Sequence, residues 1–165
     1  MSVSRANPET AGAEGSRAGT QGAVAAGVPA EQPDPLAEGL MSPNPQSIQQ
    51  TATVAEAVQF FANRAVNAAP VIDEAGRPVG VLSQADLLIH LRQKAPALAP
   101  GAEPARVQDI MTPAVFAVRR DAPSAKVIDE LLALRVHQLF VVDETGVLVG
   151  VVSAGDVFRR LYGNR

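Results

Sequence analysis

Two short motifs of the same form contain the residues best suited to bind a ligand. The first, residues 80–86, reads GVLSQAD, and the second, residues 150–156, reads GVVSAGD. Each ends an apolar, β-branched run and begins an amphipathic stretch, which predicts a strand, a tight turn and the start of a helix. A helix N-terminus presents N–H donors and partial positive charge, so both places could hold a phosphate group.

The three residue types in each motif suggest separate roles. Gly80 has no side chain and lets a ligand approach the backbone. A carboxylate repels phosphate, so Asp86 is better suited to accept both ribose hydroxyls, whereas Ser83 can donate to a phosphate oxygen. The corresponding residues of the second motif are Gly150, Ser153 and Asp156. A purely structural interpretation stays open, because Ser-x-x-Asp at a helix start is also a capping box.

The two motifs belong to a longer internal duplication. When residues 41–91 are laid over residues 111–161 without a gap, 15 of the 51 pairs are identical. Unrelated segments of ordinary composition would agree at roughly 6–8% of positions. We call residues 41–91 the first copy and residues 111–161 the second copy.

Each copy has the pattern of a βαββα unit. The first copy predicts strands at 46–50, 69–73 and 78–82, a helix that begins at the Thr53-x-x-Glu56 capping box, and a helix over 83–94. A Pro-rich turn is expected at 42–45. The second copy predicts a helical turn at 107–111, strands at 115–119, 139–142 and 147–152, and helices at 123–136 and 153–162. A unit with only three strands is too small to bury the faces of its own sheet. The two units should therefore pack on each other in an α/β (α+β) fold.

Composition limits the classes of function. The 165-residue chain has a net charge of −3 and a pI near 5.4, which argues against nucleic acid as a partner. It has no cysteine and two histidines, so neither disulfides nor a metal centre is expected. No apolar run reaches the ~20 residues that span a bilayer. No nucleophile–base pair can be assembled, and the sequence favours a soluble, cytoplasmic, non-enzymatic protein.

Four segments are expected along the chain. Residues 1–35 are rich in Ala, Gly, Ser, Pro and Glu, have no large apolar side chain, and are predicted to be a disordered tail. The first repeat domain then spans 36–94 and the second spans 107–165. Between them, residues 95–106 form a linker with prolines that favour an extended chain.

This duplicated order resembles a tandem pair of cystathionine-β-synthase (CBS) domains. The resemblance depends on the two Gly-x-x-Ser-x-x-Asp motifs, on the middle-strand segments PVID at 70–73 and FVVD at 140–143, and on the lead-ins MSP at 41–43 and MTP at 111–113. The family implies a Bateman module, in which two repeats related by a pseudo-two-fold axis enclose two clefts. Such clefts often bind AMP, ATP or other adenosyl compounds, and the modules commonly form disc-like dimers.

The resemblance adds candidate site residues outside the motifs. His137 precedes the middle strand of the second copy, where family members often direct a histidine at the ligand phosphates, and its counterpart is Asn67. Arg119 could supply a further cation. The strand hydroxyl that often faces the ligand is kept as Ser47, and the middle-strand proline is kept as Pro70 but becomes Phe140 in the second copy.

Two departures from the family favour a rival interpretation. Many members carry a basic residue just before the closing aspartate, where this chain has Ala85 and Gly155, and Phe140 could either stack on a base or fill the cleft. We therefore expect a regulatory module that binds AMP, ADP, ATP or S-adenosylmethionine and signals through conformational change, a homodimer or a separate effector protein. The alternative is a scaffold that binds no ligand and uses the fold for protein interaction.

Overall fold

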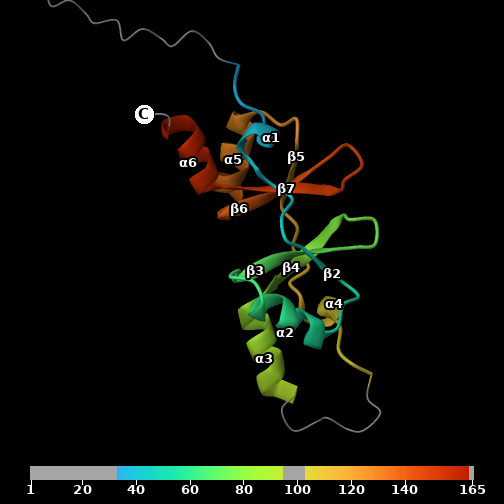
Figure 1. The fold of residues 1–165 in the computed structure, drawn as a ribbon. Helices are drawn as coiled ribbons and strands as arrows, with labels where there is room; N and C mark the ends of the chain where they lie inside the picture. Colours follow the sequence, from blue (N-terminus) through green and yellow to red (C-terminus); the bar gives the residue numbers. More distant parts are fainter. Residues whose placement is uncertain (1–32, 95–102, 164–165) are drawn as a thin grey trace, which may run out of the picture. The chain divides into compact units, whose positions relative to one another are not determined.

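The computed structural model describes residues 33–94 and 103–163 (Figure 1). The predicted tail therefore lies outside the described residues except for its last three positions, and so does most of the predicted linker. The described chain forms two β-sheets, each with its own helices. Both copies fold as mixed α/β units, as their sequence patterns predicted.

The first sheet belongs to the first copy and has the strand order β2-β3-β4. Its strands are β2 (Ile48–Gln49), β3 (Ala68–Ile72) and β4 (Pro78–Ser83). The helices whose residues pack against this sheet are α2 (Val54–Ala62), α3 (Gln84–Lys94) and α4 (Val107–Ile110). The pair β2/β3 is parallel, with α2 as its crossover, and β3/β4 is an antiparallel hairpin.

The second sheet has the strand order β1-β7-β6-β5. Its strands are β1 (Ser42–Pro43), β5 (Ala117–Arg119), β6 (Gln138–Val142) and β7 (Leu148–Ser153). The helices of this half are α1 (Ala37–Leu40), α5 (Ser124–Leu134) and α6 (Ala154–Tyr162). β5 and β6 are parallel and β6 and β7 antiparallel, which repeats the arrangement of the first sheet.

The short helix before each copy packs into the core of the other copy. Ala37 and Leu40 of α1 are buried with Val127, Leu139 and Val152 of the second copy. Val107 of α4 is buried in the core of the first copy in the same way. Figure 1 shows α1 beside α5 and α4 beside α2, although each pair is far apart in sequence. The two copies therefore exchange their lead-in helices, which their sequence patterns did not predict.

The turn predicted at residues 42–45 is wrong in its first half. Ser42 and Pro43 form β1, which pairs with β7 through Val151 and Gly150. Pro43 is tolerated because β1 is an edge strand, where one row of N–H groups needs no partner. The chain then turns at Asn44, which has a φ of 51°. The equivalent segment of the second copy forms only an isolated bridge, between Thr112 and Val81.

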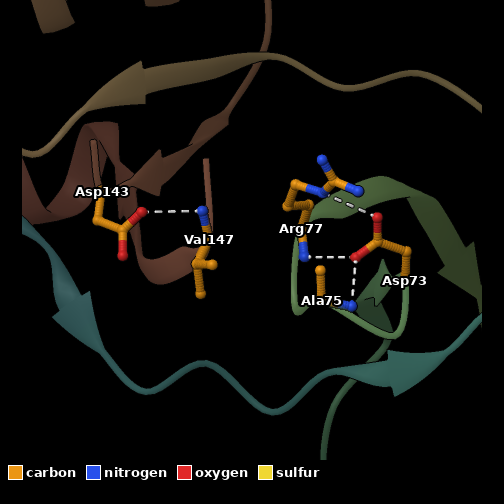
Figure 2. A network of polar contacts seen from close by, with 5 residues as sticks. All are labelled: Asp73, Ala75, Arg77, Asp143 and Val147. Carbon is orange, nitrogen blue, oxygen red and sulfur yellow. Dashed lines mark hydrogen bonds and ion pairs between the residues drawn. The ribbon is translucent and has the colours of Figure 1, made fainter. Parts of the chain in front are cut away.

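The two hairpin loops are closed by aspartates (Figure 2). Asp73 Oδ1 accepts hydrogen bonds from the backbone N–H groups of Ala75 and Arg77, both at 2.9 Å. Asp143 Oδ1 accepts from the N–H of Val147 at 3.0 Å. Each loop also has a glycine with positive φ, Gly76 at 81° and Gly146 at 83°.

These bonds stabilise the ionised carboxylates. The backbone N–H of Arg77, helped by its guanidinium, lowers the pKa of Asp73 below the usual value. The hydroxyl of Thr145, followed by the N–H of Val147, does the same for the pKa of Asp143. The loops also meet, because Leu148 N–H donates to the carbonyl of Gly76 at 3.0 Å. The equivalent bond in the other direction cannot form, since Pro78 has no N–H.

The helix that follows the first strand of each copy differs in length. α2 has 9 residues and begins at the predicted capping box, in which Thr53 N donates to Glu56 Oε2 at 2.7 Å. α5 has 11 residues and ends at Arg135, a C-cap in the left-handed conformation with φ 53° and ψ 38°. The equivalent position in the first copy, Ala65, lies beyond the end of its helix.

Candidate functional site

The motif glycines are packed against the lead-in segments. A Cβ at Gly80 would lie 2.6 Å from the carbonyl oxygen of Thr112 and 2.9 Å from Met111 Sδ. A Cβ at Gly150 would meet Met41, with its Cγ at 2.8 Å. Both glycines therefore give space to a methionine of the other copy. This packing explains why the two positions are glycine, and no ligand is needed to account for them. Their contact with a ligand stays a prediction.

The serine and aspartate of each motif bind each other. Ser83 Oγ donates to Asp86 Oδ2 at 2.7 Å, and Asp86 N donates back to Ser83 Oγ at 3.2 Å. Ser153 Oγ donates to Asp156 Oδ2 at 2.6 Å, and Asp156 N donates to Ser153 Oγ at 3.3 Å. Both motifs are therefore the capping boxes that the structural interpretation expected, and a ligand would have to compete with these bonds or use the remaining oxygen.

The remaining aspartate oxygen differs between the motifs. Asp156 Oδ1 accepts a hydrogen bond from Arg159, one turn along α6. Burial raises the pKa of Asp156, but the bonds from Ser153 and Arg159 outweigh it and leave the pKa below the usual value. The position of Arg159 is taken by Ile89 in the first copy. Asp86 Oδ1 has no hydrogen-bond partner among the described residues, so it is the freer of the two.

The helix N-termini are partly satisfied within the chain. The carbonyl of Asn67 accepts from Gln84 N at 3.0 Å, and the carbonyl of His137 accepts from Ala154 N at 3.3 Å. With the serine caps, two of the first three N–H groups of each helix are bonded. Little of either helix N-terminus is left to bind phosphate.

One cavity combines residues of both copies. It has a volume of about 380 Å³ and takes Val81 from β4 and the other residues from the second copy. Its remaining lining residues are Ala114, Phe116, Arg135, Val136, His137, Gln138 and Phe140. Phe140 is 3% exposed and Phe116 is 40% exposed, so one ring forms a wall and the other is at the opening. Apolar walls with a histidine and an arginine are suited to a ligand with a planar ring and an anionic group.

The structure does not bring the predicted site residues into one place. His137 lines the cavity just described, which we call the aromatic cavity after Phe116 and Phe140. Asp86 lines a hollow of about 700 Å³ between α3 and α4. Ser47 lines a second hollow, of about 830 Å³, beside β2 and α2. Asp156 lines a third, of about 240 Å³, at α6. The other predicted residues line none of these four hollows: Asn67, Pro70, Gly80, Ser83, Arg119, Gly150 and Ser153. Arg119 instead pairs with Asp121 at 3.2 Å.

Six of the eight lining residues of the aromatic cavity were not predicted from the sequence, and three of these six matter for the argument below. Val81 lies inside the first motif, next to Gly80, but an apolar strand side chain has no polar group that would mark it as a site residue. Phe116 precedes a strand and is more hydrophobic than its counterpart Gln46, which is a weak signal. Arg135 follows an amphipathic helix and is aligned with Ala65, so a comparison of the two copies could have found it.

Residues 33–94 and 103–163 lack two features that would suggest other classes of function. These residues contain no group of three or more His, Cys, Asp or Glu side chains that could hold a metal ion. None of their helices is both long and apolar enough to cross a bilayer.

The family model of the CBS domain matches the chain twice, at residues 37–93 and 107–163. Together with the two sheets and their exchanged helices, these matches define the class of protein. The chain belongs to the CBS domain family and contains a tandem CBS pair.

Individual relatives agree with this assignment. The chain is 35% identical over 118 residues to the 5'-AMP-activated protein kinase subunit gamma-3 of Bos taurus, covering 69% of this chain and 23% of the relative. Its fold is similar to that of CBSX2, a protein of Arabidopsis thaliana, solved in complex with AMP, with a TM-score of 0.62 and 28% identity over 78% of this chain and 96% of that one.

A second solved structure shows similar agreement. It is the cytosolic domain of the Mg²⁺ channel MgtE in complex with ATP, with a TM-score of 0.62 and 34% identity over 78% of this chain and 49% of that one. The chain spans about a quarter of the length of the kinase subunit that it matches. The similarity to the kinase subunit is therefore a similarity between CBS regions.

Proposed function

We propose that this CBS pair is a non-catalytic regulatory module that binds an adenosyl nucleotide in the aromatic cavity. The observation that carries the proposal is the cavity of about 380 Å³ itself, with Phe116, Phe140 and His137 among its lining residues. Small-molecule sites typically have roughly 300–1,000 Å³ and apolar walls with few polar groups. The complexes of CBSX2 with AMP and of the MgtE cytosolic domain with ATP support the choice of ligand.

Binding in this cavity would couple to the arrangement of the two copies. Val81 comes from the first sheet, whereas Phe116 and His137 come from the second copy. A ligand that contacts all three favours one placement of the two copies over others, and its differential affinity sets the size of the shift. Such a shift would reach a separate effector protein or a second copy of the chain.

Exposed apolar side chains support the homodimer within this proposal. Phe158, Leu161 and Tyr162 lie at helical spacing on α6 and are exposed, and Leu88 and Leu91 are exposed on α3. Clustered exposed apolar residues are typical of interaction surfaces. We propose that these helices contribute to the dimer contact.

A second candidate function is a scaffold that binds no ligand. The observation that favours it is the closure of both Ser-x-x-Asp motifs into capping boxes. The nucleotide of the first proposal lies in the aromatic cavity, whereas Asp86 lines the hollow between α3 and α4, so the ribose role expected of Asp86 has no part in that proposal. In the scaffold, both aspartates only hold the helix starts.

A ligand panel distinguishes the two functions. We would measure the melting temperature with AMP, ADP, ATP, S-adenosylmethionine and adenosine, followed by calorimetric titration of each compound that gives a shift. A ligand at 100 times its Kd should stabilise the protein by about 2.7 kcal/mol, or roughly 5–10 °C. Phe116→Ala should weaken this binding, and Leu132→Ala, an exposed apolar residue of α5 outside the cavity, is the matched control. If no compound produces a shift, the nucleotide-binding proposal fails for these ligands and the scaffold is favoured.

A further inference from the structure

Arg135 has a backbone conformation that its residue type does not favour. Its φ of 53° and ψ of 38° lie in the left-handed region, and Asn44 is the other non-glycine residue with positive φ in the described part of the chain. For an L-residue this conformation brings Cβ close to the following carbonyl, so glycine is the usual residue at this position after a helix. Backbone strain of this kind is often concentrated at functional sites.

The strained residue lies at the aromatic cavity. Arg135 lines that cavity together with His137, two residues further along. It reaches this position because α5 continues to Leu134, whereas α2 ends at Ala62. In the first copy the equivalent residue is Ala65, which has no charge. The arginine is therefore specific to the second copy.

The charges around Arg135 favour an anion. Ion pairs among the described residues involve Arg77, Arg119, Arg120 and Arg159, but not Arg135. The residues that line the aromatic cavity include no aspartate or glutamate. The guanidinium of Arg135 is thus a forked, permanently charged donor at an apolar cavity, and it is a suitable partner for a phosphate group.

We propose that Arg135 is the specificity residue that binds the phosphates of the ligand in the aromatic cavity. This inference rests on the proposed function and deepens it, because it predicts a preference for phosphorylated adenosyl compounds over adenosine and S-adenosylmethionine. The affinity should rise from AMP to ADP to ATP as the number of negative charges near the guanidinium rises.

Arg135→Gly separates this role from a structural one. Glycine relieves the left-handed strain, so the melting temperature without ligand should stay equal or rise. The affinity for ATP should nevertheless fall about 10- to 100-fold, the effect of one lost hydrogen bond to a charged group. Affinity for adenosine should not change. The ATP affinity of Arg135→Lys should lie between those of the parent chain and of Arg135→Gly. Lys126→Gln, which removes one charge from α5 outside the cavity, should bind ATP as the parent chain does.

Inorganic tripolyphosphate tests the anion site without the adenosyl group. In a nuclear magnetic resonance titration of the full chain, it should shift the backbone amides of His137 and Gln138, and Arg135→Gly should abolish these shifts. No shift in the parent chain, or equal ATP affinity in the parent and in Arg135→Gly, would overturn the assignment. If tripolyphosphate binds through Arg135 but no adenosyl compound binds, the proposed function fails and the anion site stands. If adenosyl compounds bind equally with and without Arg135, only the assignment of Arg135 fails.

Discussion

The two copies share a fold and differ where a ligand would touch them. Equivalent positions are Asn67 and His137, Pro70 and Phe140. The first copy has a 9-residue α2 and the second an 11-residue α5 that ends at Arg135. One oxygen of the aspartate of the first motif has no hydrogen-bond partner within residues 33–94 and 103–163, whereas the aspartate of the second motif is also bound by Arg159.

The comparison separates residues that maintain the fold from residues that differentiate the copies. The capping boxes, the loop aspartates and the motif glycines occur in both copies and play the same structural part in each, although individual partners differ. The histidine, the phenylalanines and the arginine of the cavity occur in the second copy alone. Duplicated positions therefore mark stability here, and the differences mark the candidate site.

Leu40→Ala gives the largest expected effect and tests the exchange of lead-in helices. Leu40 is 5% exposed and belongs to the core of the second copy, although it precedes the first copy in sequence. Its truncation should lower the free energy of unfolding by about 2–5 kcal/mol. Hydrogen exchange should show the loss of protection in β6 and β7. If β3 and β4 lose protection first, the exchange of helices is wrong.

Gly80→Ala and Gly150→Ala should differ, although the two positions are equivalent. A Cβ at Gly80 meets a backbone carbonyl, which cannot retreat, whereas a Cβ at Gly150 meets the flexible side chain of Met41. Overpacking of this kind costs about 1–3 kcal/mol, and we expect Gly80→Ala to be nearer the upper end. Urea unfolding measures both. Gly155→Ala, in α6 with ordinary contacts, is the control and should be neutral or slightly stabilising.

The two capping boxes should respond unequally to loss of their serines. Ser83→Ala and Ser153→Ala should each cost about 0.5–2 kcal/mol, because each removes the acceptor for a helical N–H. The cost should be smaller for Ser153, since Arg159 still holds Asp156. In a double-mutant cycle, adding Arg159→Gln should raise the cost of Ser153→Ala toward that of Ser83→Ala. Equal costs with and without Arg159 would contradict this difference.

The smallest effect concerns the loop aspartates and acid pH. Asp73 and Asp143 have pKa values below the usual one, so the unfolded chain binds more protons than the folded chain in this range. Their contribution to stability is complete above a pH of about 4 and is lost as the pH falls through the folded-state pKa values.

Salt should distinguish the two loops. The pKa of Asp73 depends partly on the charge of Arg77, whereas that of Asp143 depends mainly on Thr145 and Val147. In a nuclear magnetic resonance titration, high salt should therefore raise the pKa of Asp73 more than that of Asp143. Asp143→Asn should reduce the dependence of stability on acid pH, and an unchanged dependence would contradict the lowered pKa of this residue.

Much of the fold could be predicted from local patterns. The strands of the hairpins at residues 68–83 and 138–153 were predicted from their apolar runs. The capping box at Thr53 was predicted from its spacing. The strand β1 was missed because Ser-Pro favours a turn locally, and its pairing with β7 comes from the other half of the chain. The exchange of α1 and α4 was missed for the same reason. It depends on contacts between residues far apart in sequence, which composition and periodicity do not encode.

The candidate site was predicted less well. The Ser-x-x-Asp spacing predicted the capping boxes and ligand contacts equally, and the structure shows the first. His137 was named from the family resemblance and does line the aromatic cavity. Arg135 was missed because its importance depends on its left-handed backbone and on the length of α5, which the predicted end at residue 136 placed too late.

The exchange of α1 and α4 means that the unit repeated in the sequence is not the unit that folds. A fragment that ends at Lys94 would take α1 away from the sheet that it closes and would leave the first sheet without α4. Neither half of the duplication can complete its own interior, so an ancestor with a single copy would have needed a second molecule to supply the missing helix. Fusion of two copies in one chain makes that association permanent, and it then allows the two copies to diverge from each other.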